Sequence, residues 1–525
     1  MILPPGHNSY SEYFSACCKF LDDYQWIFNF PVTEIFVRNV TSHIPETWVS
    51  PLSSLSDEEL CDFPVDLVKD CWPDSLLEFC HQCEKLKAKP PVFNDADALE
   101  IPELLKTGVT PKKTHEVDNF VPFIHSYCKK SNINNIVDIG SGLGYLDLFL
   151  YLKYNYKILG IEYGEKLVQT SRSSYEKLQK SLPENHAGEI QYIVNRVVPE
   201  SLGELQTIIS DFFSKPPKTR GKGNQKSTSK PYIVPPRAIT PNLEEKIETL
   251  NLDSFHTALS NPSLKTDEDI HVNSNVCLVG LHTCGDLCID SLDLFLRSDN
   301  CKLCILLACC YHKLSKAVTL NSLSDDPRSN LTGVDFFKNF PLSLSLKEVV
   351  FKATPMISFL QIPFLRLAAN ETAKRWSSLS KEKHENQLFH TSARAVIQLY
   401  LHQNDLAMRK TKRRCVTKIN VNDFNSYLIC FLSRNQLIRK SGEIVNHDCP
   451  ELIDSICKLW EEMKLKERLV KIILSLQAKV QFVAESLVII DRVRYLLEKN
   501  MKSVEIVRVL DDSISPRALA LCVRK

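Results

Sequence analysis

The stretch "NNIVDIGSGLGYLDLFL", residues 134–150, decides the fold of this chain. A run of apolar and β-branched residues leads into three closely spaced glycines, and an apolar segment with helical spacing follows. That order predicts a buried strand, a tight turn and a helix. The turn could hold a ligand or simply join the strand to the helix, and residues elsewhere in the chain decide between the two.

Further short apolar runs predict more strands, and helical segments separate most of them. Strands that alternate with helices form parallel βαβ units, so we expect an α/β fold with helices on both faces of one sheet. The last two runs follow a long predicted helix over residues 478–500, and we expect the final strand to be antiparallel. The seven predicted strands cover residues 135–140, 156–162, 189–195, 275–284, 302–310, 503–512 and 517–525.

The 525 residues exceed one ordinary domain core, so length alone predicts two to four structural units. One segment, residues 214–271, opens with a stretch rich in Pro, Gly, Ser and Lys and is expected to be a disordered insertion. The α/β core is predicted to be discontinuous in sequence. The expected regions are an N-terminal helical region over 1–107, the first part of the core over 108–320, a mostly helical insertion over 321–469, and the C-terminal helix and strand pair of the core over 470–525.

Composition narrows the class of protein. Lys and Arg number 64 and Asp and Glu 63, so there is no global basic field, and any nucleic-acid-binding surface must be local. Residues 214–237 and 407–418 are locally basic, and each is either a solvated segment or a nucleic-acid contact. The second segment could also be a localisation signal. The 19 scattered cysteines are interpreted as reduced thiols, which predicts a cytoplasmic and/or nuclear location. The first residues do not resemble a secretory signal, and the apolar run 303–310 is too short to span a membrane, so no membrane association is expected.

The residues around the first turn favour one cofactor over another. A dinucleotide-binding turn, G-x-G-x-x-G, needs glycine at position 145, where this chain has Tyr145. An acid two residues before the first glycine disfavours a pyrophosphate and suits the cationic methionine end of S-adenosylmethionine. Glu162 ends the second predicted strand, where a carboxylate can accept both ribose hydroxyls of an adenosine. We therefore expect S-adenosyl-L-methionine, bound by Asp138, Gly140, Ser141, Gly142, Gly144, Glu162 and His282.

Polar residues and cysteines end the fourth and fifth predicted strands, where we expect a methyl acceptor to approach the cofactor. His282 could act as a general base or orient the acceptor. Asp286 could orient His282 or cap the helix that follows. Cys310 and His312 are expected to shape the acceptor site. The candidate catalytic residues are His282, Asp286, Cys310 and His312.

Two groups of cysteines have spacings that a zinc ion could use. In the first group two adjacent cysteines lie at the end of a strand, and neighbours on a strand point to opposite faces, so they are poor joint ligands. The second group has C-x2-C spacing without a clear second pair, and a helix face accounts for it. We therefore expect no metal site. The residues concerned are Cys301, Cys304, Cys309, Cys310 and His312 in the first group, and Cys80 and Cys83 in the second.

Five segments together resemble the methyltransferase-like protein 25 family: "TPKKTHEV", "VDIGSGLGYLDLFL", "LHTCGDL", "CCYHKLS" and "SPRALAL". The resemblance implies a class I S-adenosylmethionine-dependent methyltransferase fold with a Rossmann-like seven-stranded sheet. The core is also similar to that of the eukaryotic tRNA ribose 2′-O-methyltransferases, which end their fourth and fifth strands with His-x-Cys-Gly and Cys-Cys-His-His segments. Here Tyr311 replaces the first His of the second segment. The resemblance also puts Lys112, Lys113, His115 and Glu116 at the edge of the pocket, although a solvated turn accounts for them equally well.

The resemblance implies direct, in-line transfer of a methyl group to an oxygen or nitrogen acceptor, by positioning plus, where needed, one general base. We expect the acceptor to be tRNA, rRNA or a ribonucleoprotein, and we expect no stable partner. A protein methyltransferase and a non-catalytic S-adenosylmethionine-binding scaffold are the alternatives. The fourth strand lacks the Asn/Asp-Pro-Pro-Tyr/Phe tetrad of adenine N6 enzymes, which disfavours that chemistry.

Overall fold

The structure is a computed structural model that describes residues 3–94, 110–182, 186, 188–215, 275–317, 337–353, 357–411, 423–445 and 449–525. The predicted disordered insertion lies outside the described residues, apart from residues 214–215. The second basic segment is described only as far as residue 411.

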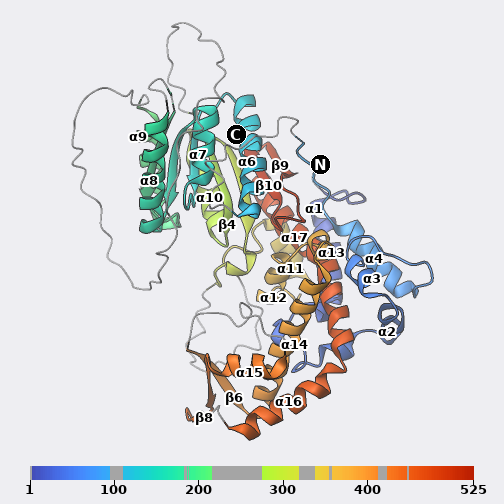
Figure 1. Cartoon of the computed structure of the whole chain (residues 1–525). Helices are drawn as coiled ribbons and strands as arrows, with labels where there is room; N and C mark the ends of the chain where they lie inside the picture. The colour runs from blue at the N-terminus through green and yellow to red at the C-terminus, as the bar shows by residue number, and fades with distance from the viewer. Residues whose placement is uncertain are drawn as a thin grey trace. The chain divides into compact units, whose positions relative to one another are not determined.

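A seven-stranded sheet forms the α/β part of the chain (Figure 1), in the order β3-β2-β1-β4-β5-β10-β9. β1 pairs in parallel with β2 and β4, and β2 pairs in parallel with β3. β9 and β10 pair antiparallel, so the expected α/β sheet with a final antiparallel strand is confirmed. The strand order reverses between β1 and β4, and ligands of α/β sheets bind at such a reversal. The strands are β1 Asn135–Ile139, β2 Lys157–Glu162, β3 Glu189–Val194, β4 Val276–Cys284, β5 Cys301–Cys309, β9 Ser503–Arg508 and β10 Leu519–Arg524.

The chain divides into two compact units. Their boundaries differ from those of the four regions predicted from the sequence, and the four regions stay a prediction. Unit 1 contains Met1–Val92, His282–Ile289 and Leu307–Lys525, and unit 2 contains Phe93–Leu281 and Asp290–Leu306. β4 and β5 cross from one unit to the other.

In unit 2, helices cover the first strands of the sheet. α7 and α8 each contact β2 and β3, α9 contacts β2, and α6 contacts α7 (Figure 1). α6 begins where Thr110 Oγ1 accepts the Lys113 amide at 3.3 Å, with Pro111 at the first helical position. The helices are α6 Pro111–Lys130, α7 Tyr145–Tyr154, α8 Glu165–Ser181 and α9 Leu202–Phe213, and α10 Leu287–Arg297 crosses between the units.

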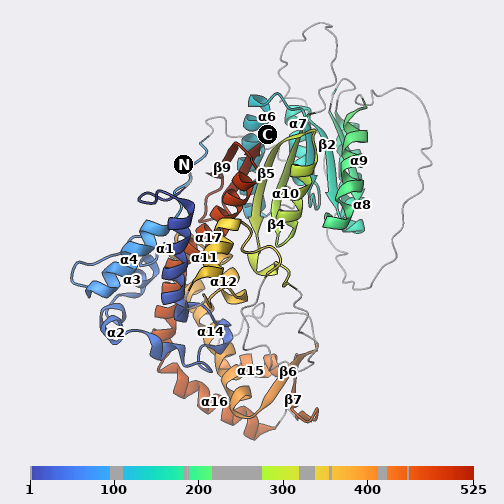
Figure 2. The same ribbon diagram turned by 180° about the vertical axis from the view of Figure 1, so that it is seen from behind.

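Unit 1 is built around α17, Glu467–Glu498, which contacts α1 to α4 and α11 to α14 (Figure 2). It also contains a three-stranded sheet in the order β6-β7-β8. The helices are α1 Tyr10–Asp23, α2 Glu46–Ser53, α3 Asp57–Asp62, α4 Asp74–Leu86, α11 Leu344–Lys352, α12 Ile362–Ala368, α13 Ala373–Ser377, α14 Lys381–Gln403, α15 Phe424–Leu432 and α16 Pro450–Lys464, and the strands are β6 Leu406–Lys410, β7 Asn435–Arg439 and β8 Ile444–Val445.

α17 is long and apolar enough to cross a membrane by length and composition, but 94% of its most apolar window is buried inside the protein. Two of its buried polar residues have partners in the N-terminal region. Gln477 Nε2 donates to the Ile27 carbonyl at 2.9 Å, and Lys479 Nζ donates to the Phe63 carbonyl at 2.9 Å. Because α17 is buried and these polar side chains are hydrogen-bonded, α17 is explained as the core helix of unit 1.

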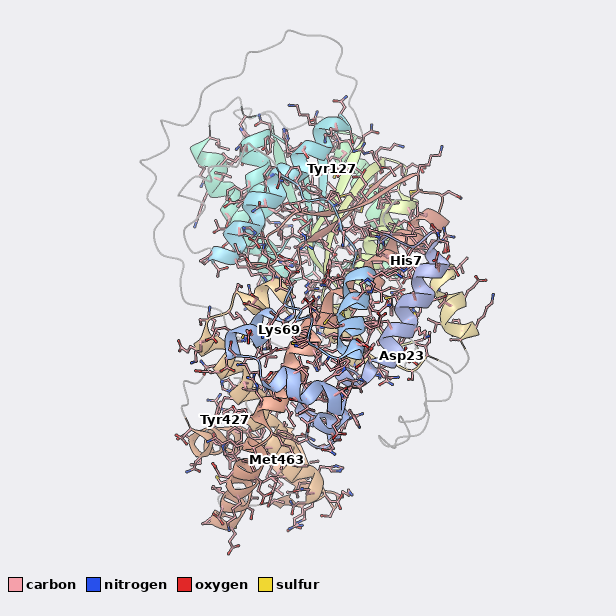
Figure 3. The ribbon with its side chains drawn as sticks, turned by 90° about the vertical axis from the view of Figure 1, so that its right-hand side faces the viewer. His7, Asp23, Lys69, Tyr127, Tyr427 and Met463 are labelled. Atoms are coloured by element: carbon pink, nitrogen blue, oxygen red, sulfur yellow. The ribbon has the colours of Figure 1, made fainter. Side chains whose placement is uncertain are left out.

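An aromatic cluster holds the middle of the predicted insertion together. Tyr427 of α15, labelled in Figure 3, lies edge-on to Phe389 of α14 with ring centroids 5.7 Å apart. Phe424 of α15 stacks on Trp460 of α16 with centroids 4.4 Å apart. These rings bury the facing sides of three helices that lie apart in the sequence.

Candidate functional site

The glycine loop, residues 140–144, joins β1 to α7. Gly140, Gly142 and Gly144 have φ angles of 74°, 57° and 72°, in the left-handed region that residues with side chains rarely adopt. A methyl group on Gly144 would also collide with the Tyr192 hydroxyl and lie 2.9 Å from its Cζ atom. Glycine at position 144 is therefore required for both conformation and space.

The main-chain N–H groups of the glycine loop donate within the protein. The Gly140 and Ser141 amides donate to the Ile161 carbonyl at 2.8 and 3.2 Å. The Gly142 amide donates to Oε2 of Glu162 at 3.2 Å. Phosphate-binding loops direct such amides at the anion. These three amides are therefore not available to a pyrophosphate.

Glu162, at the end of β2, is buried and holds the loop in place. Its Oε1 accepts the Gly164 amide at 2.9 Å, in addition to the Gly142 contact of Oε2. Ser171 Oγ of α8 donates to the Gly142 carbonyl at 2.9 Å. A carboxylate oxygen can accept more than one hydrogen bond, so these contacts leave Glu162 able to accept ligand hydroxyls.

A second acid lies beside Asp138, and we call the two residues the acid pair. Asp138 is on β1 and Asp147 is in the first turn of α7, and both are buried. By hydrogen-bond geometry Oδ1 of Asp138 and both carboxyl oxygens of Asp147 have no partner among the described residues. Burial raises the pKa of Asp138 to about 7 and, together with the neighbouring Asp138 carboxyl, raises the pKa of Asp147 well above its usual range.

Tyr192 and Lys113 complete the surroundings of the acid pair. A methyl group on Gly160 would lie 2.5 Å from Cδ1 of Tyr192, so the missing side chain makes room for that ring. Burial, and then the charges of the acid pair, raise the pKa of Tyr192 well above its usual range. Burial lowers the pKa of Lys113, and nearby acids, including the acid pair, act in the opposite direction. Lys113 is thus the cation that faces this group of acids from α6.

By hydrogen-bond geometry, five buried polar atoms around the glycine loop have no partner in the described part of the chain: Oδ1 of Asp138, Oγ of Ser141, both carboxyl oxygens of Asp147 and the hydroxyl of Tyr192. Buried polar atoms without partners are uncommon and call for an explanation such as a ligand. The loop offers acceptors, acids and small residues, and its amides are used internally. The residues present therefore fit S-adenosylmethionine, a ligand with a cationic end and ribose hydroxyls, better than a dinucleotide.

The predicted catalytic residues, among them His282, which is also predicted to bind the cofactor, lie in unit 1. The glycine loop, Asp138 and Glu162 lie in unit 2. In unit 1 three thiols lie close together, and we call Cys284, Cys309 and Cys310 the thiol cluster. Their Sγ atoms all lie within 4.8 Å of one another, and the Sγ atoms of Cys284 and Cys309 are 2.9 Å apart. The Cys309 thiol, and to a smaller extent Cys310, Lys313 and His282, lower the pKa of Cys284 to about 6 against the opposing effect of burial.

The prediction that Cys309 and Cys310 point to opposite faces of a strand is wrong. β5 ends at Cys309, and Cys310 has a φ of 48°, outside the strand conformation. The alternation of side chains holds only within a strand. The turn brings both thiols into one cluster with Cys284 of β4.

The structure gives Asp286 partners other than those expected. Its Oδ2 accepts the Ser315 amide and hydroxyl at 2.8 and 2.6 Å, and its Oδ1 accepts Asn339 Nδ2 at 2.7 Å. These contacts fix the segment after β5, while a role in orienting His282 stays a prediction. His282 itself has a φ of 66°.

His312 and Tyr311 follow the thiol cluster in a short 3₁₀ helix, Tyr311–Lys313. Nδ1 of His312 is buried and has no hydrogen-bond partner within the described ranges, and burial lowers the pKa of His312. Tyr311 is buried, and its hydroxyl donates to Oε1 of Glu485 at 3.2 Å. The tyrosine that replaces a histidine is thus a core residue of unit 1.

Sequence reasoning missed Asp147 and Tyr192. The available signal was a lone acid in the apolar helix "YLDLFLYL", which is unusual for a buried face. Cys80 and Cys83 lie on the buried face of α4, in agreement with a helix face. Burial raises the pKa of Cys80, and it raises the pKa of the Cys83 thiol further.

Comparisons with known proteins show what part of this chain is similar to. A family described as "Methyltransferase domain" matches residues 112–317. The human and mouse proteins named "Probable methyltransferase-like protein 25" are 26% identical over 266 residues and 22% identical over 264 residues. Each match covers 39% of this chain and 44% of the relative, so the chain matches less than half the length of these curated relatives. Residues 112–317 are therefore similar to a methyltransferase domain, and the chain is similar to proteins named methyltransferase-like protein 25.

Proposed function

We propose that this methyltransferase uses S-adenosyl-L-methionine and binds it at the glycine loop, Asp138 and Glu162. The observation that carries this proposal is the internal use of the loop amides beside three buried acids. A pyrophosphate would find these loop amides already used by the protein, so it would lack the hydrogen-bond donors that a phosphate-binding loop offers. A ligand with a cationic sulfonium and ribose hydroxyls meets acceptors.

The cofactor, when bound, supplies an electrophilic methyl group on a sulfonium. Glu162 is held by two main-chain amides and is positioned to accept the ribose hydroxyls. Oδ1 of Asp138 and Oγ of Ser141, which have no hydrogen-bond partner within the described ranges, are the further groups that would contact this ligand. The glycines let the backbone approach it closely. Chain residues thus hold and orient the cofactor, which is the larger part of catalysis in a methyl transfer.

We propose RNA as the methyl acceptor and His282 as the residue that takes up its proton or orients it. The similarity to tRNA ribose 2′-O-methyltransferases supports this choice. Exposed Arg409 and Lys410 on β6 also support it, because they begin the second basic segment. We place the enzyme in the cytoplasm or nucleus, without a stable partner.

Calorimetry with S-adenosylmethionine on the full chain tests the cofactor proposal. Glu162→Ala should weaken binding by about tenfold or more, because a charge-assisted acceptor is worth roughly 1.5–3 kcal/mol. Glu165→Ala is the matched control, since Glu165 is exposed in the first turn of α8. Equal affinity of wild type and Glu162→Ala would contradict the proposed site, and no binding to wild type would contradict the cofactor.

A methyl-labelled cofactor incubated with cell lysate tests the acceptor. Label that nuclease removes and protease leaves is the expected result. Label that survives nuclease and is lost to protease would identify a protein methyltransferase, and the absence of label despite cofactor binding would identify a scaffold. His282→Ala should lower turnover more than cofactor affinity, and unchanged turnover would remove its role.

A further inference from the structure

We propose that Cys284, Cys309 and Cys310 bind one Zn²⁺ ion through three thiolates. The three Sγ atoms lie within 4.8 Å of one another in unit 1, at the ends of β4 and β5. Cys309 is buried, and Cys284 and Cys310 are partly exposed, so the cluster is reachable from solvent. The inference does not depend on the proposed cofactor or acceptor.

The backbone around the cluster is shaped to bring the thiols together. The Gly285 amide donates to the Cys309 carbonyl at 3.3 Å, which ties the end of β4 to the end of β5. Gly285 has a φ of 56°, and a methyl group there would lie 2.7 Å from the Lys313 carbonyl oxygen. The left-handed turn at Cys310 then places the third thiol beside the other two.

Zinc fits this donor set best. Thiolate sulfur is a soft ligand that selects zinc over magnesium or calcium. Sulfurs bound to zinc at about 2.3 Å in a tetrahedron stand roughly 3.8 Å apart. Cys284 and Cys309, now 2.9 Å apart, need to separate by less than about 1 Å to reach that spacing.

The charges around the cluster also suit a bound zinc ion. Binding releases a proton from each thiol to solvent, and three thiolates around Zn²⁺ carry a net charge of −1. Lys313 lies close enough to Cys284 and Cys310 to interact with that charge. Three protein ligands leave the fourth tetrahedral position to water, as in catalytic rather than closed structural zinc sites.

A buried cysteine core and a disulfide are the competing explanations. Core thiols have apolar neighbours, and close contacts among three of them are not needed for packing. A disulfide between Cys284 and Cys309 would use only two thiols and would not explain why Cys310 lies beside them. The zinc site uses all three.

Metal analysis of the full chain, purified without chelators and under reducing conditions, tests the proposal. We expect about one zinc per chain in wild type and a drop of at least tenfold in Cys284→Ser and in Cys310→Ser. Cys71→Ser removes an exposed thiol, and Cys80→Ser removes one thiol of the C-x2-C pair, and both should keep their zinc. Zinc lost in Cys80→Ser but kept in Cys284→Ser would overturn the assignment, as would wild type without zinc.

If a cysteine variant fails to fold, X-ray absorption spectroscopy on zinc-loaded wild type still tests the ligand set. Three sulfur neighbours and one lighter atom around zinc are expected, and four sulfurs or none would overturn the ligand set. A thiol count on the metal-free chain should find Cys284 and Cys309 both reduced. A disulfide between them under the same reducing conditions would reject the site.

Discussion

The glycine loop and the thiol cluster both lie at the ends of sheet strands, but they are built by different means. The glycine loop is one continuous segment with four amides that donate inside the protein, and carboxyl oxygens of the acid pair beside it have no hydrogen-bond partner among the described residues. The thiol cluster joins residues from two strands and a turn, and a buried polar network next to it reaches into α17. Local sequence therefore defines the first site, whereas tertiary structure defines the second.

The network beside the thiol cluster should have the largest effect on stability. Arg517 Nη1 donates to Oε1 of Glu485 at 2.6 Å and to the Ala368 carbonyl at 2.7 Å, and both charged residues are buried. Arg517→Ala leaves Glu485 buried without this partner and should lower the free energy of unfolding by about 3–5 kcal/mol. Chemical denaturation measures this loss.

The exposed pair of Arg38 and Glu34 is the control for that change. Arg38→Ala should cost less than about 1 kcal/mol, because solvent screens such pairs. Equal losses for the two substitutions would show that the buried network stabilises the fold no more than an exposed ion pair does.

The glycine loop should show a smaller loss. Gly144→Ala combines a left-handed φ with a collision against the buried Tyr192, and should cost about 2 kcal/mol and abolish cofactor binding. Gly203→Ala in α9 is the control, since a methyl group there meets nothing within 4 Å and alanine favours helices. A Gly144→Ala variant as stable as wild type would mean that the loop is not constrained.

The acid pair predicts how stability depends on pH. Burial raises the pKa of Asp138 to about 7, and burial together with the Asp138 carboxyl raises the pKa of Asp147 well above its usual range, whereas both carboxyls ionise near pH 4 in the unfolded chain. Between these values the folded acid pair holds more protons than the unfolded pair, so the contribution of the pair to stability is greatest at low pH and falls as pH rises toward 7. The slope should be about 1.4 kcal/mol per pH unit for one group, and Asp138→Asn should flatten it. Parallel unfolding profiles of wild type and variant from pH 4 to 7 would refute the prediction.

The smallest effect belongs to Tyr311. Tyr311→Phe removes one hydrogen bond to Glu485 at 3.2 Å and should cost about 1 kcal/mol. Methyl transfer and zinc content should not change, because the hydroxyl faces the core. Tyr163→Phe, at a residue 75% exposed, should leave both stability and activity unchanged. A loss of turnover in Tyr311→Phe alone would place this tyrosine in the site.

The seven strands could be predicted from the sequence because each is a short apolar run bounded by polar or glycine residues. The boundary between α16 and α17 could not. Residues 465–466 separate the two helices without a glycine or proline, and the amphipathic pattern continues across them.

In the candidate site, too, some features could be predicted from the sequence and others could not. Gly140 to Gly144 and Glu162 follow from spacing along the chain. The approach of Asp147 to Asp138 depends on how α7 lies on the sheet, and the convergence of Cys310 with Cys309 depends on one φ angle. Neither is encoded in local periodicity.

The contacts of α17 determine which parts of the chain can fold first during synthesis. Lys479 donates to the Phe63 carbonyl across a separation of 416 residues, and the antiparallel pair β9 and β10 follows the same helix. Contacts so distant in sequence form slowly and leave early segments exposed until late ones are synthesised. The N-terminal helices emerge first but acquire their core last. We therefore expect newly made chains to engage chaperones until residues 467–524 have left the ribosome.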